Sequence, residues 1–288
     1  MKDHGRVSVS GREFIRHPGR WVALLVLLLI TAVVLFPFYQ VVINSFKSYP
    51  EIVADVNALP TQLHFENFTE AYNRMNYPAA FINTLIVTVA ATAGIVFLAS
   101  LAGYQIARKK TKTSKVVFFL LIIPMMIPFQ SFMISLVTVS SFLEIYESMW
   151  GLAIIYWACG VPMSVFLYRG YIMGIPKELD EAASIDGCNA FQTYLRVIFP
   201  ILKPITATVI IINAMWIWND YLLPRLIIGF NSDHFTLQLQ AVQFRGMYKM
   251  EWQFIMAGFL LTLIPALIIF LVLQKQIVKG MVAGAVKG

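Results

Sequence analysis

Four of the fifteen carboxylates in this chain of 288 residues fall within nine positions of one stretch, "ELDEAASIDG": Glu178, Asp180, Glu181 and Asp186. Pro176 suits the first turn of a helix and Gly187 suits its C-terminal exit, so residues 176–187 are predicted to form a short helix. The first three carboxylates then lie where the helix dipole stabilises negative charge, but Asp186 lies in the last turn, where the dipole opposes it. A charge in an unfavourable position indicates that a partner contacts this helix.

The same helix carries one narrow apolar stripe, formed by Leu179, Ala182 and Ala183, and its two alanines would let another backbone approach closely. The following residues, "NAFQTYLRVIFP", predict a second short apolar helix that Pro200 ends. Residues 176–200 are therefore expected to form a helix–glycine–helix hairpin. The stripe is too narrow to form a core by itself, so a surface in another chain is expected to cover it, with a solvated amphipathic loop as the alternative.

A second polar group interrupts an apolar run that ends near residue 228: Trp216, Trp218, Asn219 and Asp220. An ionised side chain in the middle of a membrane costs roughly 2.5 to 3.5 kcal/mol unless it faces a cavity or a partner. These four side chains could therefore hydrogen-bond and stack on a polyol such as a sugar along a translocation pathway, with Trp218, Asn219 and Asp220 as the main candidates. The alternative is that the polar side chains brace neighbouring helices and the tryptophans lie in an interfacial aromatic belt. Gln130, beside a proline, is a second pathway candidate or an interhelical hydrogen-bonding group.

No catalytic or metal-binding pattern accompanies these residues. The nucleotide-binding motif G-x-x-x-x-G-K-[ST] does not occur, and no polar segment between the apolar runs is long enough to form an ATPase. The four histidines form no triad or metal cluster at a recognisable spacing, and the two cysteines match no metal spacing. We expect no catalytic site, no metal and no cofactor in this chain.

The elements that position these residues are apolar runs of membrane-spanning length. The chain is 59% hydrophobic and only 13% charged, against about 25% charged in soluble proteins. Runs of about 20 apolar residues, enough to cross a hydrocarbon core of ~30 Å, lie at 21–43, 80–106, 116–139, 149–169, 205–228 and 254–273. The third run holds two prolines and is predicted to be one kinked helix. The predicted fold is an all-α integral membrane protein with six transmembrane helices and a cytoplasmic helical hairpin between the fourth and the fifth.

The distribution of basic residues sets the orientation of the spans. With both termini on one side, 17 of the 22 Lys and Arg residues fall on that side, together with the hairpin. The positive-inside rule places this side in the cytoplasm. The predicted domains are a cytoplasmic tail at 1–20, a six-span region at 21–275 and a cytoplasmic tail at 276–288. No basic stripe with interleaved aromatic residues indicates a nucleic-acid partner, so the net charge of +7 is assigned to orientation and to anionic headgroups of the lipid bilayer.

The sequence "EAASIDG", followed nine residues later by "VIFP", closely resembles the EAA loop of the membrane subunits of bacterial ABC importers. The family pattern is Glu-Ala-Ala, three residues, Gly, nine residues and Ile-x-Leu-Pro. The matching positions are Glu181, Ala182, Ala183, Gly187 and Pro200. Val197 and Phe199 replace the Ile and Leu of the pattern by other apolar residues. In that family the loop is the coupling helix that docks into a groove of the ATPase subunit. The resemblance implies that role for residues 176–200, Asp186 included.

Other segments, in order along the chain, are similar to the second membrane subunit of carbohydrate importers of the maltose-transporter type: "NTLIVT", "AGYQIAR", "MMIPFQSFMI", "WNDYLLP" and "VKGMVAGAVKG". The resemblance implies a permease subunit in the bacterial inner membrane that imports a sugar, with an oligosaccharide expected, by alternating access. It implies a second homologous permease subunit, a dimer of ATPase subunits that binds ATP and Mg, and an extracytoplasmic solute-binding protein. An ion-gradient-driven secondary carrier is the alternative, but it would need more intramembrane carboxylates than Asp220 and usually an internal repeat.

Two further segments take a role from the resemblance. The predicted outer loop at 229–252 is too long for a simple turn and is expected to contact the solute-binding protein, with a plain surface loop as the alternative. The C-terminal segment with Gly280, Gly284 and Gly288 is expected to reach into the ATPase dimer interface, with a frayed tail as the alternative.

Overall fold

The computed structural model describes residues 18–243 and 250–285, and within these ranges the elements are helices and no strand occurs. Four helices are long and apolar enough to cross a membrane: α2 (Pro18–Ser45), α5 (Tyr77–Arg108), α8 (Met149–Ile172) and α15 (Trp252–Ala285). They correspond to the first, second, fourth and sixth predicted spans. The all-α class predicted for a membrane protein is therefore confirmed.

The predicted third span is broken rather than kinked. It consists of α6 (Lys112–Ile122), the 3₁₀ turn η1 (Ile123–Met126) and α7 (Phe129–Phe142), and its two arms are bent by 108°. Ile127 is extended, with φ −90° and ψ 123°, which is the conformation favoured for a residue that precedes a proline, here Pro128. The prediction of a single kinked helix was wrong, because this extended residue redirects the chain.

The predicted fifth span is also divided. Three short helical segments lead into it: α10 (Ala190–Thr193), the π-helical turn η2 (Tyr194–Ile198) and α11 (Phe199–Ile201). The span itself begins with α12 (Lys203–Asn219). The chain bends by 78° before α12, and α13 (Leu222–Ile227) follows after a break at Asp220. The unbroken run predicted over 205–228 was wrong, because Pro224 lacks the N–H that would bond to the Asp220 carbonyl. The described part of the chain has six spans if each bent pair is counted as one.

Helices α5 and α8 pack along each other and form the centre of the structure. Two glycines of α5 permit their close approach. A Cβ on Gly94 would lie 2.1 Å from the Trp157 ring, and one on Gly103 would lie 2.8 Å from Tyr168 Cβ. Trp157 also donates from Nε1 to the Ala90 carbonyl at 3.1 Å. Small residues at such an interface bring two backbones together, which is a common basis for helix packing in lipid.

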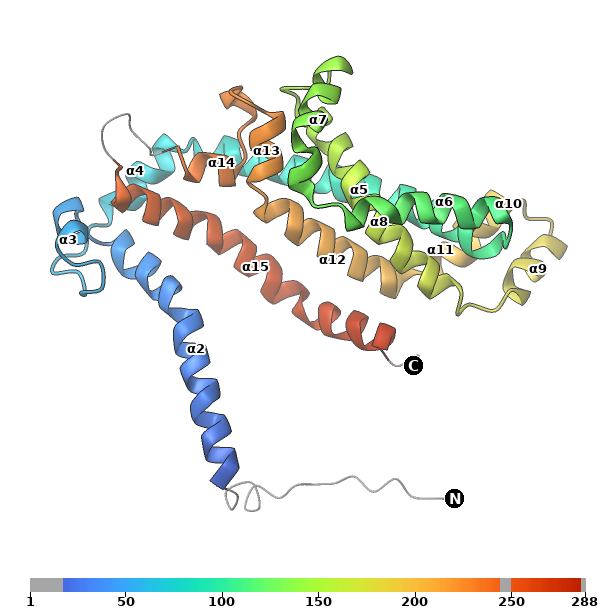
Figure 1. Ribbon diagram of the computed structural model, residues 1–288, viewed down its shortest axis with the longest axis horizontal. Coiled ribbons are helices and arrows are strands. Elements are labelled where there is room, and N and C mark those ends of the chain that lie inside the picture. Colours follow the sequence, from blue (N-terminus) through green and yellow to red (C-terminus); the bar gives the residue numbers. More distant parts are fainter. Residues whose placement is uncertain (1–17, 244–249, 286–288) are drawn as a thin grey trace.

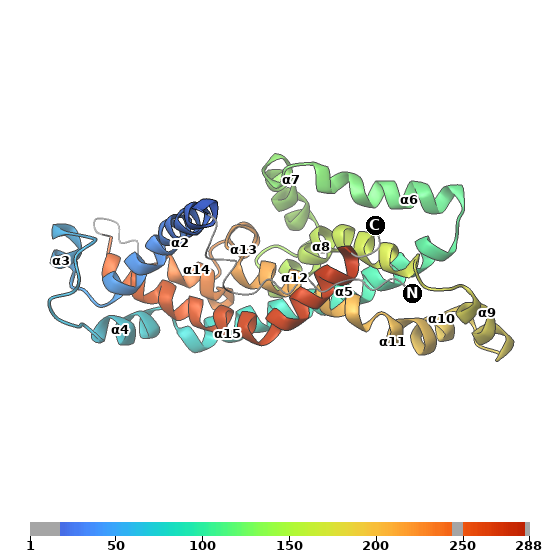
Figure 2. The ribbon, with the colours of Figure 1, turned by 90° about the horizontal axis from the view of Figure 1, so that it is seen from below.

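The molecule is elongated and carries different elements at its two ends (Figures 1 and 2). One end holds α3 (Tyr49–Ala54) and α4 (Glu66–Arg74), which follow the first span. The other end holds α9 (Glu178–Ile185), which lies within the predicted hairpin. The predicted hairpin and the loop after the first span therefore lie at opposite ends, as a membrane-spanning arrangement requires.

Helix α2 diverges from the other helices (Figure 1). Every residue from 21 to 39 is exposed, and the segment from 21 to 46 contains no charged residue. Near its C-terminal end, Phe38 and Val42 face Phe259 of α15 across a small apolar cavity. A helix that is apolar on every face requires lipid or another subunit around it.

Candidate functional site

A short helix, α9, occupies the region in which the sequence predicted one at 176–187. Its chain leaves the helical conformation at Asp186, and Gly187 then adopts a left-handed φ of 82°. No atom lies within 4 Å of a Cβ built on Gly187. The left-handed backbone, and not crowding, is what requires glycine at this helix exit.

The faces of α9 differ from the stripe predicted for it. Ala183 is 5% exposed and packs on the rest of the chain, whereas Ala182 and Glu181 are exposed. Leu179 is 37% exposed and Ile185 is 87% exposed. A large apolar side chain left almost entirely in solvent marks a surface that another molecule covers. The sequence reasoning missed Ile185, although its spacing of three from Ala182 places both on one face of the helix.

An ion pair joins α9 to the end of α5. Arg108 Nη2 lies 2.8 Å from Asp180 Oδ2, and Tyr104 donates from its hydroxyl to Asp180 Oδ1 at 2.5 Å. The side chains of Arg108 and Asp180 are 13% and 20% exposed, so solvent screens this pair less than a surface pair. Arg108 also donates to the carbonyls of Ile175 at 3.0 Å and Pro176 at 3.4 Å. One guanidinium group thus holds together the end of α5, the segment after α8 and the first turn of α9.

The second half of the hairpin is helical but irregular. Asn189 and Gln192 form a capping box, in which each side chain accepts a hydrogen bond from the backbone N–H of the other, at 3.0 and 2.9 Å. The Tyr194 hydroxyl shares a hydrogen bond of 2.7 Å with Ser100 Oγ on α5. Pro200 was predicted to end a helix, but it lies within α11. It is tolerated there because the first turn of a new helix needs no N–H from it.

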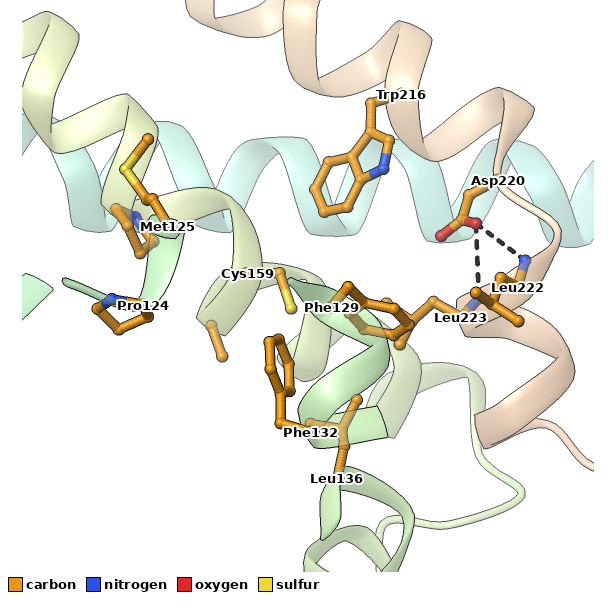
Figure 3. A pocket seen from close by; sticks show the side chains of 12 residues that line it. Pro124, Met125, Phe129, Phe132, Leu136, Cys159, Trp216, Asp220, Leu222 and Leu223 are labelled. Carbon is orange, nitrogen blue, oxygen red and sulfur yellow. Dashed lines mark hydrogen bonds between the residues drawn. The ribbon is translucent and has the colours of Figure 1, made fainter. Parts of the chain in front are cut away.

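A cavity of about 470 Å³ opens beside the divided third and fifth spans (Figure 3). Its wall is mostly apolar and aromatic: Pro124, Met125, Phe129, Phe132, Leu136, Ala158, Cys159, Pro162, Trp216, Asp220, Leu222 and Leu223. Figure 3 shows the Trp216 indole and the Phe129 and Phe132 rings around this space, with the Asp220 carboxylate at its edge. A cavity of this volume can hold a small-molecule ligand.

Asp220 lies in the break between α12 and α13, and both of its carboxylate oxygens accept hydrogen bonds. The Leu222 N–H donates to Oδ1 at 3.0 Å, and the Tyr156 hydroxyl of α8 donates to Oδ2 at 2.9 Å. The Trp216 ring packs edge-on against Tyr156, with centroids 5.3 Å apart. Asp220 therefore braces α8 against the start of α13 and also lines the cavity. Its role on a sugar pathway stays a prediction.

The other pathway candidates do not line this cavity. Trp218 is 2% exposed and packs edge-on against Phe81, with ring centroids 5.7 Å apart. Asn219 is exposed and donates to a backbone carbonyl one turn earlier at 2.8 Å. Gln130 is exposed near the start of α7. Of the two tryptophans considered in the sequence, Trp216 lines the cavity and Trp218 does not, because positions four apart share a helix face and positions two apart do not.

The predicted outer loop at 229–252 is folded against the helices over its first half. It contains η3 (Ser232–His234) and α14 (Leu237–Ala241), and the leucines of α14 are fully buried. The Leu237 N–H donates to Thr84 Oγ1 of α5 at 2.9 Å. A plain surface loop would not bury its side chains in this way, so this half is part of the packed structure.

Three predicted segments extend beyond the described residues. The N-terminal tail lies outside them over 1–17, the outer loop over 244–249, and the C-terminal segment over 286–288, which includes Gly288. The backbone of α15 is helical through Gly280 and Gly284 to Ala285.

The described residues at these sites offer charge, hydrogen bonds and aromatic surface. Within 18–243 and 250–285, no group of three or more His, Cys, Asp or Glu side chains is placed to hold a metal ion. Cys159 and Cys188 are both free thiols. The arrangement offers a carboxylate and aromatic rings to a ligand in the cavity, and an acidic, partly apolar helix to a docking partner.

Residues 95–283 match the family described as "Binding-protein-dependent transport system inner membrane component". The chain is 40% identical, over 87% of its length and 91% of the relative, to the "probable starch degradation products transport system permease protein" of Thermoanaerobacterium thermosulfurigenes. It is 36% identical, over 88% and 92%, to the multiple sugar-binding transport system permease protein of Streptococcus mutans. It is 37% identical, over 88% and 91%, to the melibiose/raffinose/stachyose import permease protein of Bacillus subtilis.

Among solved structures, a chain of a bacterial ABC transporter involved in the import of the acidic polysaccharide alginate has the same fold. The TM-score is 0.77 at 21% identity, with 94% of this chain and 99% of the other covered. The matched residues 95–283 include α9, α12 and α13, so the match contains both sites described above. The chain belongs to the binding-protein-dependent transport system inner membrane component family and is a membrane-spanning permease subunit.

Proposed function

We propose that this chain is one of two membrane subunits of an ATP-driven, binding-protein-dependent importer of oligosaccharides. The family match over residues 95–283, joined with sugar permease relatives that cover most of the chain, carries this proposal. The proposed partners are a second homologous permease subunit, a pair of ATPase subunits that bind ATP and Mg, and an extracytoplasmic solute-binding protein. A solved alginate ABC transporter in complex with an alginate pentasaccharide-bound periplasmic protein shares the fold, at a TM-score of 0.64 and 16% identity, which supports the last partner.

The coupling role is proposed for α9 and the residues around it: Glu181, Ala182, Ala183, Asp186, Gly187 and Pro200. The exposed face with Ile185 and Glu181 would dock on the ATPase, and ATP binding there would move the helix. Ala183 and the Arg108–Asp180 ion pair attach α9 to the spans. A movement of α9 would therefore move the spans with it. The motion would then open the spans outward in alternating access.

The sugar pathway is proposed to pass the cavity lined by Trp216 and Asp220. A sugar offers hydroxyl donors to a carboxylate and apolar ring faces to an indole, and the cavity places both groups at one wall. The names of the relatives, which cite starch degradation products and the melibiose, raffinose and stachyose series, favour an oligosaccharide. Trp218, Asn219 and Gln130 do not line the cavity, so they would act on this pathway through the residues that do.

The orientation proposed from the basic residues places both termini and α9 in the cytoplasm of a bacterial cell. The end with α3 and α4 then faces outward, where the solute-binding protein would arrive. This arrangement agrees with the position of α9 at the opposite end of the molecule.

The experiment is sugar uptake by the whole importer in proteoliposomes, with ATP supplied on the ATPase side. Uptake that requires ATP and the binding protein, and that persists when ionophores dissipate ion gradients, supports the proposal. Uptake that follows an ion gradient without ATP would replace it by a secondary carrier. Gly187→Asp and Glu181→Lys should each reduce uptake by weakening ATPase docking or coupling, and undiminished uptake by both variants would contradict the role proposed for α9.

A further inference from the structure

A cavity of about 500 Å³, separate from the cavity with Asp220, lies between α5, α6 and α8. These helices approach α9 at one end of the molecule (Figure 2). Ten residues line it: Ile106, Ala107, Lys109, Lys110, Ser114, Lys115, Phe118, Phe119, Arg169 and Met173. Four of the ten are basic and none is acidic. A concentration of positive charge without a neutralising carboxylate in the wall indicates an anionic ligand.

The guanidinium of Arg169 is held in place at this cavity. Its Cζ lies 4.2 Å from the centroid of the Phe118 ring, so the charge is stacked on an aromatic face. Its Nε is buried and has no hydrogen-bond partner among the described residues. A buried N–H without an acceptor costs free energy unless a ligand oxygen completes it. The α6 helix also begins beside the cavity, at Lys112. Thr111 Oγ1 already accepts the Ser114 N–H at 3.1 Å, and the remaining first-turn N–H groups favour an anion.

The wall of the cavity also contains apolar side chains. Ile106, Phe118, Phe119 and Met173 form part of its wall. The α6 helix that flanks it has no buried residue, and Phe119 and Leu120 are 64% and 63% exposed. An exposed apolar helix of this kind is suited to hydrocarbon, while the lysines at its start suit a charged headgroup at the membrane surface. Free phosphate would use only the basic part of this wall.

We propose that this cavity binds an anionic phospholipid of the inner leaflet. Its phosphodiester would lie among Lys109, Lys110, Lys115 and the free N–H of Arg169, and an acyl chain would follow the exposed face of α6. The headgroup binds at the end of α5 that carries Arg108, so the lipid would steady the helix to which α9 is attached. The site needs the cytoplasmic orientation proposed above, but it does not depend on the identity of the sugar.

The test is native mass spectrometry of the complete importer released from membranes that contain phosphatidylglycerol or phosphatidylcholine. The wild type should retain phosphatidylglycerol in preference. The cavity variant should lose affinity by about fivefold for each lysine removed, and it carries three substitutions: Lys109→Gln, Lys110→Gln and Lys115→Gln. The matched control removes equal charge from the same predicted side, outside the cavity wall and away from α6: Lys177→Gln, Arg196→Gln and Lys203→Gln. It should retain the lipid like the wild type.

Three outcomes would overturn the proposal. Equal loss of lipid by the cavity variant and the control would show that general surface charge, and not this cavity, holds the lipid. Displacement of phosphatidylglycerol by inorganic phosphate alone would make the site a phosphate site. The Phe119→Cys variant places a cysteine at the cavity. If this cysteine cross-links to another subunit and not to a lipid photoprobe, protein covers the cavity. Sugar uptake by the wild type tests the proposed function separately from all three.

Discussion

The ion pair between Arg108 and Asp180 gives the most direct test of how α9 is attached to the spans. The perturbation is Asp180→Asn, which keeps the size of the side chain and removes its charge. The amide oxygen can still accept the Tyr104 hydroxyl, which now donates at 2.5 Å. Arg108 can still donate to the backbone carbonyls of Ile175 and Pro176. What is lost is the charge-assisted contact of 2.8 Å between α5 and α9.

The magnitude of this loss follows from the burial of the pair. The Asp180 Oδ2 atom is buried and accepts no hydrogen bond, so its contact with Arg108 is an ion pair without hydrogen-bond geometry. Removal of one partner of a fully buried ion pair costs about 3 to 5 kcal/mol. The side chains of Arg108 and Asp180 are 13% and 20% exposed. Their ion pair should therefore contribute more than the roughly 0 to 1 kcal/mol that an exposed ion pair contributes. Arg108 keeps its hydrogen bonds to the carbonyls of Ile175 and Pro176 and is not left unpaired. We therefore expect Asp180→Asn to weaken the attachment of α9 by about 2 kcal/mol. This value shifts the equilibrium between attached and released α9 by about thirtyfold.

The assay is the number of ATP molecules hydrolysed per sugar imported by the reconstituted importer. Asp180→Asn should raise this ratio severalfold while the ATPase still co-purifies with the membrane subunits, because the exposed face of α9 is unchanged. Tyr104→Phe removes one neutral donor and should raise the ratio less. Glu178→Gln is the matched control, since Glu178 is an exposed carboxylate on the same helix, and it should leave the ratio near that of the wild type.

Two results would refute this reasoning. If Asp180→Asn couples as well as Glu178→Gln, the ion pair does not transmit motion. If Asp180→Asn instead separates the ATPase from the membrane subunits, the carboxylate acts at the docking surface and not as an attachment to α5.

Three further predictions concern other parts of the molecule. Gly94→Ala should destabilise the protein by about 1 to 3 kcal/mol, because its Cβ would lie 2.1 Å from the Trp157 ring, and thermal unfolding followed by tryptophan fluorescence will measure it. Asp220→Leu should cost about 1 to 3 kcal/mol in the same assay, because it removes the acceptor of the Tyr156 hydroxyl and of the Leu222 and Leu223 N–H groups. The Thr61 hydroxyl, as donor to Glu51, lowers the pKa of that carboxyl from 4.5 to about 2. The ionised Glu51 carboxylate therefore stabilises the folded state fully above pH 4.5, and this contribution is lost as the pH falls through about 2. Amide hydrogen exchange of the surrounding loop should show this acid step in the wild type but not in Glu51→Gln.

Helix identity and position could be predicted from the sequence because they depend on local composition. Four of the six predicted spans agree with single helices to within a few residues at most boundaries, since a run of about 20 apolar residues has few other ways to satisfy its backbone in lipid. The exception is α15, which continues well past residue 273. The divided spans were harder to predict. A proline in the sequence shows that an N–H is missing. The bend between α6 and α7 depends on what these two helices pack against, and composition does not contain that information.

The candidate site could be predicted only where its residues are neighbours in sequence. The position of α9 and the left-handed turn at Gly187 follow from a short local pattern. The pairing of Arg108 with Asp180 does not, because each has a sufficient local explanation: orientation of a span for the first and a helix dipole for the second. Trp216 and Trp218 were both considered beside Asp220 because the three are close in sequence, and only helical geometry separates them: Trp216 lines the cavity, whereas Trp218 packs on Phe81.

The attachments of α9 have a mechanical consequence for the spans. Arg108 holds both the segment after α8 and the start of α9, and Gly94 and Gly103 leave almost no space between α5 and α8. A force on the exposed Ile185 would therefore move α5 and α8 together, because closely packed backbones transmit displacement with little deformation. Asp220 bonds to Tyr156 of α8 and to the first turn of α13, so the same movement reaches the wall of the cavity. Helix α2, exposed from residue 21 to 39, shares none of these contacts over that length and can stay in place while the packed helices move.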